Sequence, residues 1–123
     1  MKILFWLLPI ADLFYLDRIL DFYRRWGVDI PPAHARLGLL ERWVGYLPVG
    51  TIAGKYLGVR SLMLFLGVFP LVGALELYLM CKGVRPWRFF RGKPRESVTK
   101  IFLLEAYNCF NYFALGVLIG VIL

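Results

Sequence analysis

Two long apolar stretches dominate the pattern of hydrophobic and polar positions along the chain. Residues 61–81 and residues 101–123 each contain a single charged side chain, Glu76 in the first stretch and Glu105 in the second. Because a helix rises about 1.5 Å per residue, each stretch spans roughly 30 Å, which is the thickness of the hydrocarbon core of a bilayer. The sequence therefore predicts two transmembrane helices, 61–81 and 101–123.

The first 48 residues predict helices of a different kind, amphipathic and interfacial. Residues 1–16 are apolar, but a proline and an aspartate interrupt them, so this segment is too short to cross a bilayer. Between residues 12 and 26 the polar side chains gather on one side of a helix. Such a helix lies in the headgroup plane or against a partner's membrane domain, and the sequence leaves both interpretations open. A second amphipathic stretch follows Pro31 and Pro32 and is expected to stop at Pro48.

Residues 49–60 contain three glycines at four-residue spacing, Gly50, Gly54 and Gly58. In a helix, this spacing forms a groove that lets another helix approach closely. Two basic residues in the same segment instead favour a position at or outside the membrane interface, and a glycine-rich composition is typical of a flexible connector. The sequence therefore favours a glycine-rich connector over a helix contact in this segment.

Residues 82–100, between the two predicted spans, form a basic loop with seven basic residues and one acidic residue. The positive-inside rule places this loop on the inner side and both termini outside. Its rings and cations alternate, which suits a headgroup layer where cations meet anionic phosphate. We expect the loop to bind an acidic, cardiolipin-like phospholipid or to act only as a topology signal; tethering at both ends disfavours nucleic-acid binding. The expected lipid-binding residues are Arg85, Trp87, Arg88, Arg91, Lys93 and Arg95.

Composition agrees with an all-α membrane protein. Hydrophobic residues make up 60% of the 123 residues, whereas soluble domains have roughly 45 to 50%. One histidine and two cysteines are too few for a disulfide framework, a zinc module or a bis-histidine haem site. His34 has no nucleophile at a recognisable spacing, so we expect no catalytic residue, metal or cofactor and no enzyme activity. The expected fold comprises interfacial helices in residues 1–48, a connector in 49–60, and a two-span helical hairpin whose basic loop is 82–100.

Glu76 and Glu105 are expected at the same depth in this hairpin. Glu76 lies five residues before Cys81, and Glu105 lies five residues after Lys100. In antiparallel helices both carboxylates therefore lie about 7 to 8 Å inside the boundary nearest the loop. A carboxylate in lipid is costly, so each should face protein, water or a cation. Structural ion pairs with nearby basic residues, a proton-carrying role and snorkelling to the interface all remain open.

Small and polar residues indicate which faces of the spans contact protein. On the second span, Glu105, Tyr112, Gly116 and Gly120 share one face, and the spacing of the two glycines allows close helix approach. Pro70 predicts a kink in the first span. The residues expected toward lipid are Leu103, Leu104, Phe110, Val117 and Leu118. The expected helix-contact residues are Gly73, Glu76, Glu105, Asn108, Tyr112, Gly116 and Gly120.

These features favour a non-catalytic accessory subunit of a large membrane complex. Small basic subunits of this kind are frequent in energy-converting complexes of the mitochondrial inner membrane, namely the ATP synthase membrane sector and the respiratory chain. The expected partners are other subunits and anionic lipids, with no nucleic acid and no small-molecule substrate. Two alternatives remain: a small ion or proton transport component that uses Glu76 and Glu105, and a hairpin protein that curves the membrane.

Overall fold

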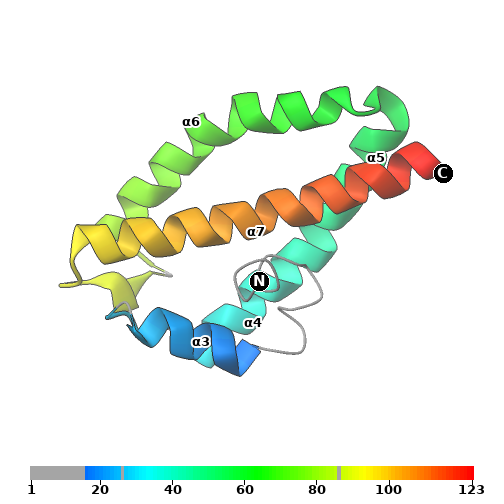
Figure 1. Ribbon diagram of the computed structural model, residues 1–123. Coiled ribbons are helices and arrows are strands. Elements are labelled where there is room, and N and C mark those ends of the chain that lie inside the picture. Colours follow the sequence, from blue (N-terminus) through cyan, green and yellow to red (C-terminus); the bar gives the residue numbers. More distant parts are fainter. Residues whose placement is uncertain (1–15, 26, 86) are drawn as a thin grey trace.

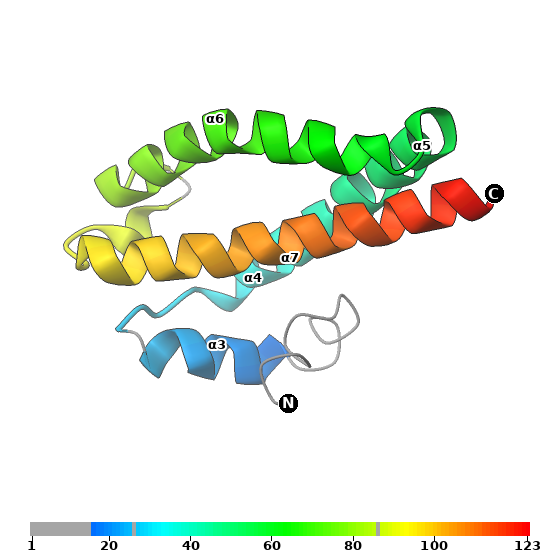
Figure 2. The ribbon, with the colours of Figure 1, turned by 45° about the horizontal axis from the view of Figure 1, so that its top comes forward.

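The computed structural model describes residues 16–123 apart from residues 26 and 86, and every regular element in this part of the chain is a helix. Helix α3 (Leu16–Arg25) begins the described part, and the apolar segment expected before it lies outside the described residues. Longer helical passes follow, and Figures 1 and 2 show them running along the length of the molecule. Two of these helices, α6 (Arg60–Lys82) and α7 (Arg95–Ile122), are long and apolar enough to cross a membrane.

The first long pass consists of α4 (Pro32–Glu41), the π-helical turn η1 (Arg42–Tyr46) and α5 (Leu47–Leu57), which follow one another without a break. The expectation that Pro48 ends the second amphipathic helix is therefore wrong. Proline lacks an N–H group, and its ring collides with the carbonyl four residues earlier in an α-helix. In η1 the N–H of Leu47 donates instead to the carbonyl of Arg42, five residues earlier. This wider turn accommodates the proline, and the helix continues.

Two glycines with positive φ set the limits of α6. Gly58 (φ 65°) separates α5 from α6, and Gly83 (φ 67°) ends α6 in the left-handed conformation that glycine adopts without steric cost. The first predicted span, 61–81, therefore matches α6 to within one residue at each end. Pro70 lies inside α6, and Figure 1 shows this helix arched above α7.

Helix α7 begins earlier than the second predicted span. It starts at Arg95, directly after Pro94, and Glu96 lies in its first turn, where the helix dipole favours an acidic residue. The predicted loop, 82–100, is therefore too long at its C-terminal end, because residues 95–100 belong to α7. The remaining connection contains the short 3₁₀ helix η2 (Arg88–Phe90).

Glycines on both helices bring α5 and α7 into close contact. Gly50 lies against the backbone of Phe113 and Gly54 against the backbone of Val117, so a Cβ atom at either glycine would overlap a carbonyl oxygen. Gly116 of α7 lies in the same way against the backbone of α5, as does Gly120. The pairs follow in the same order along both helices, so α5 and α7 run in the same direction. The prediction of a flexible connector is wrong for residues 49–57, which form a helix and its contact surface.

This contact also corrects part of the expected lipid-facing surface of α7. Val117 is only 1% exposed, because Gly54 packs directly on it. Phe110 is half-buried and its ring contacts Phe65 of α6. Leu103 and Leu118 are exposed, as lipid-facing residues would be.

Phenylalanine rings fill the wider space between α6 and α7. The ring of Phe65 stacks on Phe69 at 5.1 Å and on Phe113 at 4.9 Å between centroids, and it lies 5.5 Å from Phe110. The rings of Phe69 and Phe102 are 6.2 Å apart and nearly parallel. Large rings keep two helices farther apart than glycines do, so α7 has one closely packed neighbour, α5, and one more distant neighbour, α6.

A cluster of buried apolar side chains lies at the end of the molecule that holds the connection between α6 and α7. Helix α3 packs into this group through Leu20 and Tyr23. Figures 1 and 2 show the C-terminus at the opposite end. Helix α3 lies near this loop end because the pass from residue 32 to residue 57 carries the chain along the molecule toward the opposite end. The N-terminus, which was expected on the side opposite the loop, lies outside the described residues. The buried members of the group are Leu20, Tyr23, Val28, Ile30, Met80, Phe90, Val98, Ile101 and Phe102.

Candidate functional site

A cavity of about 140 Å³ lies between the helices near the loop end of the molecule. Three glutamates line it, Glu41 at the end of α4, Glu76 of α6 and Glu105 of α7. The sequence predicted that Glu76 and Glu105 lie at one depth, and the structure places them in one cavity. Glu41 comes from a segment that was expected at the interface, outside the hairpin. The other polar residues that line the cavity include His34, Arg42, Tyr46, Asn108 and Cys109.

The register of α5 against α7 explains why these residues meet. Gly50 and Phe113 are 63 residues apart, as are Gly54 and Val117. Because the two helices run in the same direction, the offset of 63 residues also applies to the residues before Gly50. It places Tyr46 near the level of Cys109 and Arg42 near the level of Glu105. The glycine contact at one end of α7 thus determines which groups of α4 and η1 face its acidic end.

Tyr112 fixes the turn that presents Arg42. The ring of Tyr112 is fully buried and meets the indole of Trp43 edge to face, at 5.5 Å between centroids. The guanidinium of Arg42 lies over the same ring at 5.7 Å, a distance that allows a cation–π interaction. Tyr112 therefore contacts η1 directly, which is the role of a helix-contact residue.

Asn108 is a deeply buried amide in the wall of the cavity. Its exposed fraction is 7%, and it lines the cavity between the levels of Glu105 and Cys109. Among the described residues, no hydrogen bond of the Asn108 side chain is present. A buried amide ordinarily has a hydrogen-bond partner. The cavity is the space from which such a partner can reach it.

His34 lies on α4 and is half-buried. Its imidazole meets the ring of Phe89 edge to face at 4.8 Å. Burial lowers the pKa of His34 below its ordinary value of 6.5, and the negative charge of Glu41 partly offsets this effect. His34 is therefore neutral at pH 7.

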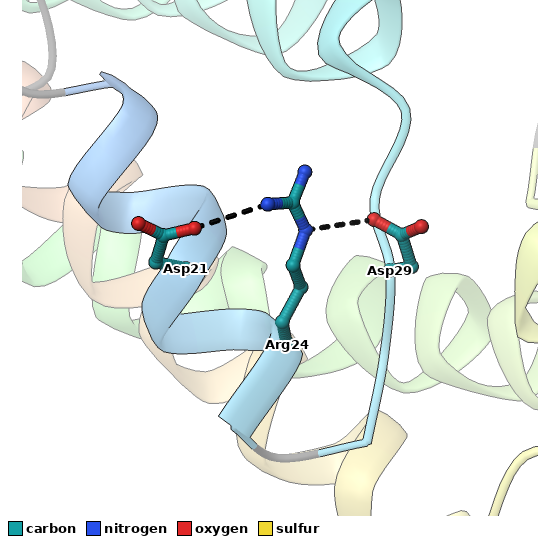
Figure 3. Close-up of polar contacts among 3 residues, drawn as sticks. All are labelled: Asp21, Arg24 and Asp29. Carbon is teal, nitrogen blue, oxygen red and sulfur yellow. Dashed lines mark hydrogen bonds and ion pairs between the residues drawn. The ribbon is translucent and has the colours of Figure 1, made fainter.

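An ion-pair clamp holds α3 beside the segment that leads into α4. The guanidinium of Arg24 donates to Asp21 at 3.0 Å and to Asp29 at 3.1 Å (Figure 3). The hydrogen bond to Asp29 is the main reason that the pKa of Arg24 lies above its ordinary range. The clamp joins the two elements that supply Tyr23 and Ile30 to the cavity wall.

The expected lipid-binding residues fall into two groups. Trp87 lines the cavity, and the Nε atom of Arg91 donates to the carbonyl of Gly83 at 3.1 Å, across the end of α6. The neighbouring ring of Phe90 is buried in the protein core, where the sequence suggested the headgroup layer. The members of this set that remain exposed to the outside, apart from Arg91, are Arg85, Arg88, Lys93 and Arg95.

The basic residues that the sequence offered as partners for the two span glutamates do not line the cavity. Lys100 pairs with Glu96 at 3.4 Å, and the ammonium of Lys82 lies 4.9 Å from the ring centroid of Tyr78. Arg42 is the cation that lines the cavity instead. Both cysteines, Cys81 and Cys109, are free. Within residues 16–123, gaps excepted, no cluster of histidine, cysteine and acidic side chains is placed to hold a metal ion.

The remaining expected contact residues meet other helices. An added Cβ atom at Gly73 of α6 would lie 3.1 Å from the ring of Phe102 and 3.2 Å from that of Phe69. Gly116 and Gly120 face α5, as described above. The structure thus distributes the expected contact residues over two interfaces, one of glycines and one of aromatic rings, with the cavity beside them.

No protein-family model, curated protein or solved structure matches this chain.

Proposed function

We propose that the protein is a non-catalytic accessory subunit of a multi-subunit membrane complex, inserted through α6 and α7 and docked through the outer face of α6. The observation that carries this proposal is the exposed apolar surface of α6. Its side chains point away from the rest of the chain along most of its length, and Leu71 is 77% exposed. A surface of this size and composition is typical of contact with lipid or with other proteins.

Two small residues on that surface favour a protein partner. Gly67 is exposed, and a Cβ atom added there meets nothing within 4 Å. Ala74 is also exposed and lies seven residues later, on nearly the same side of the helix. Small residues let another helix approach closely, and in a membrane such packing is a main source of helix association. The core formed by α5 and α7 would give this surface a rigid support.

The composition of the chain also suggests in which membrane and in which kind of complex it resides. We infer an energy-converting complex of the mitochondrial inner membrane, either the ATP synthase membrane sector or a respiratory complex. The formal net charge of +7 and the exposed cations near η2 support it, because they suit a surface rich in anionic lipid such as cardiolipin.

Native electrophoresis of mildly solubilised membranes tests the accessory role. The 14.3 kDa chain is expected to migrate in a far larger band, and mass spectrometry of the band should identify the same set of other subunits in repeated preparations. The double substitution Gly67→Leu and Ala74→Leu should release the chain from this band while it stays membrane-bound. Val72→Phe is the control, because it adds bulk at an exposed position on another side of α6. Migration of the wild type as a monomer or a homo-oligomer would contradict the proposal.

A second candidate is a transport component, and the meeting of Glu76 and Glu105 in one cavity favours it. In this role the carboxylates carry a proton or an ion along a path through the complex. The two functions differ in the effect of Glu105→Gln. A transport role predicts that ion flux stops while the complex assembles normally, whereas the accessory role predicts that flux through the assembled complex is unchanged.

A further inference from the structure

The cavity beside Glu105 has more acidic side chains than basic ones. Three carboxylates line it, and among the described residues the one guanidinium on its wall is that of Arg42. His34 adds no positive charge at pH 7, because burial favours its neutral form. Carboxylates in a partly enclosed space are costly unless a cation compensates them. The excess of acidic over basic side chains therefore favours a cationic ligand.

Aromatic rings form much of the remaining wall. Tyr23, Tyr46, Phe69, Trp87 and Phe102 come from different elements and line the same space as the glutamates. The face of an aromatic ring attracts a cation, and a ring wall combined with acidic groups is the usual surroundings of an organic ammonium ion in proteins. The composition of the wall therefore points to an ammonium group.

The side chain of Asn108 gives evidence for a ligand that does not depend on the charges of the cavity. Its side chain is 7% exposed, lines the cavity, and has no hydrogen-bond partner among the described residues. An amide oxygen accepts a hydrogen bond from an N–H group, so an ammonium ligand supplies the missing partner. A primary ammonium satisfies this oxygen directly, and a quaternary one does so through a bridging water.

The size and position of the cavity narrow the ligand further. Its volume, about 140 Å³, is well below the roughly 300 to 1,000 Å³ of pockets for drug-sized molecules. A single small headgroup fits such a space. The connection that supplies Trp87 also carries the exposed cations Arg85 and Arg88, which suit a phosphate attached to the same headgroup.

We propose that this cavity binds an ammonium group, presented either by the headgroup of a zwitterionic phospholipid or by a free small amine. The carboxylates of Glu76 and Glu105 compensate its charge, the aromatic wall surrounds it, and Asn108 faces it. The phospholipid source rests on the proposed membrane location, and the free-amine source does not.

Binding is measured on the purified full-length chain in detergent. Native mass spectrometry compares the retention of phosphatidylethanolamine with that of phosphatidylglycerol carrying the same acyl chains. Saturation-transfer NMR with ethanolamine and with choline tests the free amine. We expect the wild type to retain the ethanolamine lipid at least tenfold better than the glycerol lipid, or to bind a free amine. Preferential retention of the ethanolamine lipid identifies a phospholipid headgroup as the source of the ammonium group. Binding of a free amine without this lipid preference identifies a free small amine as the ligand.

Ligand binding is then compared between the wild type and a variant without the two acidic groups of α6 and α7. The double variant Glu76→Gln and Glu105→Gln should lose this binding at least tenfold. Glu96→Gln is the matched control, because Glu96 also lies on α7 but is exposed and pairs with Lys100. If the double variant does not fold, Glu41→Gln is measured in its place, with the same expected loss. Equal retention of both lipids together with no amine binding would overturn the proposal, as would full binding by the glutamine variant. Neither failure affects the native-electrophoresis test of the accessory role.

Discussion

Gly54 of α5 and Val117 of α7 lie backbone against backbone, with no room for a side chain on the glycine. This contact, repeated by Gly50, Gly116 and Gly120, sets the register of the first long pass against α7. The register in turn brings η1 to the acidic end of α7. The packing of one pair of helices and the composition of the cavity are therefore linked.

Substitution of Gly54 tests this link. Gly54→Val should destabilise the protein by about 3 kcal/mol, because overpacking a close contact costs about 1 to 3 kcal/mol and occasionally more, and here the obstructing atoms are backbone. The free energy of unfolding in detergent micelles measures the effect. Gly67→Ala is the control, since an added Cβ at Gly67 meets nothing within 4 Å. Equal stability of the valine variant and the control would show that α5 does not pack on α7 in this way.

The phenylalanine layer between α6 and α7 depends on Phe65, whose ring contacts three other phenylalanine rings. Phe65→Ala should lower the free energy of unfolding by about 2 kcal/mol. This is less than the roughly 3 to 5 kcal/mol typical of a fully buried phenylalanine, because Phe65 is half-buried. Leu64→Ala, at an exposed position one residue earlier, should cost much less under the same conditions. A similar loss for both variants would argue against a packed aromatic layer.

His34 predicts a pH dependence of stability. Burial depresses its pKa in the folded protein below the ordinary value of 6.5, so the unfolded chain binds the proton more readily. The contribution of His34 is therefore complete above pH 6.5 and is lost as the pH falls through the folded-state value. The wild type should lose more stability between pH 8 and pH 5 than His34→Gln. Identical pH profiles of the two proteins would mean that His34 is not buried in the neutral form.

The clamp around Arg24 predicts a local effect near α3. Arg24→Gln removes the ion pairs with Asp21 and Asp29, so the backbone amides of residues 27–30 should exchange hydrogen faster. The pairs are exposed, and high salt should reduce the difference between variant and wild type. Arg25→Gln is the matched control on the next residue. Unchanged exchange in Arg24→Gln would show that the segment is held by its apolar contacts alone.

The sequence predicted the parts of the fold that depend on local pattern. The length and composition of residues 61–81 predicted α6 to within one residue at each end. The spacing of Glu76 and Glu105 predicted that they lie at one depth, and both line the same cavity. These inferences need only the helical rise and the polarity of neighbouring residues. The start of α7 at Arg95 was missed, because the charged residues before 101 resemble a loop although they extend the helix.

The partner of α7 could not be inferred from either helix alone. Glycine has a low helix propensity, and Lys55 made residues 49–60 resemble a connector. The available signal was the matching four-residue spacing of Gly50 and Gly54 with that of Gly116 and Gly120. Pairing the two motifs in the parallel direction is enough to place Arg42 near Glu105. His34 and Glu41 are more than 60 residues from Glu105 along the chain, so their place in the cavity depends on that long-range packing.

The central claim is that the exposed face of α6 docks on another subunit, and site-specific photo-crosslinking in native membranes tests it most directly. A photoreactive group at Leu71, which is 77% exposed, should crosslink to one reproducible polypeptide other than this chain. The combined Gly67→Leu and Ala74→Leu substitutions should abolish that crosslink. The same group at Val117, which is 1% exposed, should form no crosslink to another polypeptide. Crosslinks from Leu71 to lipid alone, or to a second copy of the chain, would contradict the account.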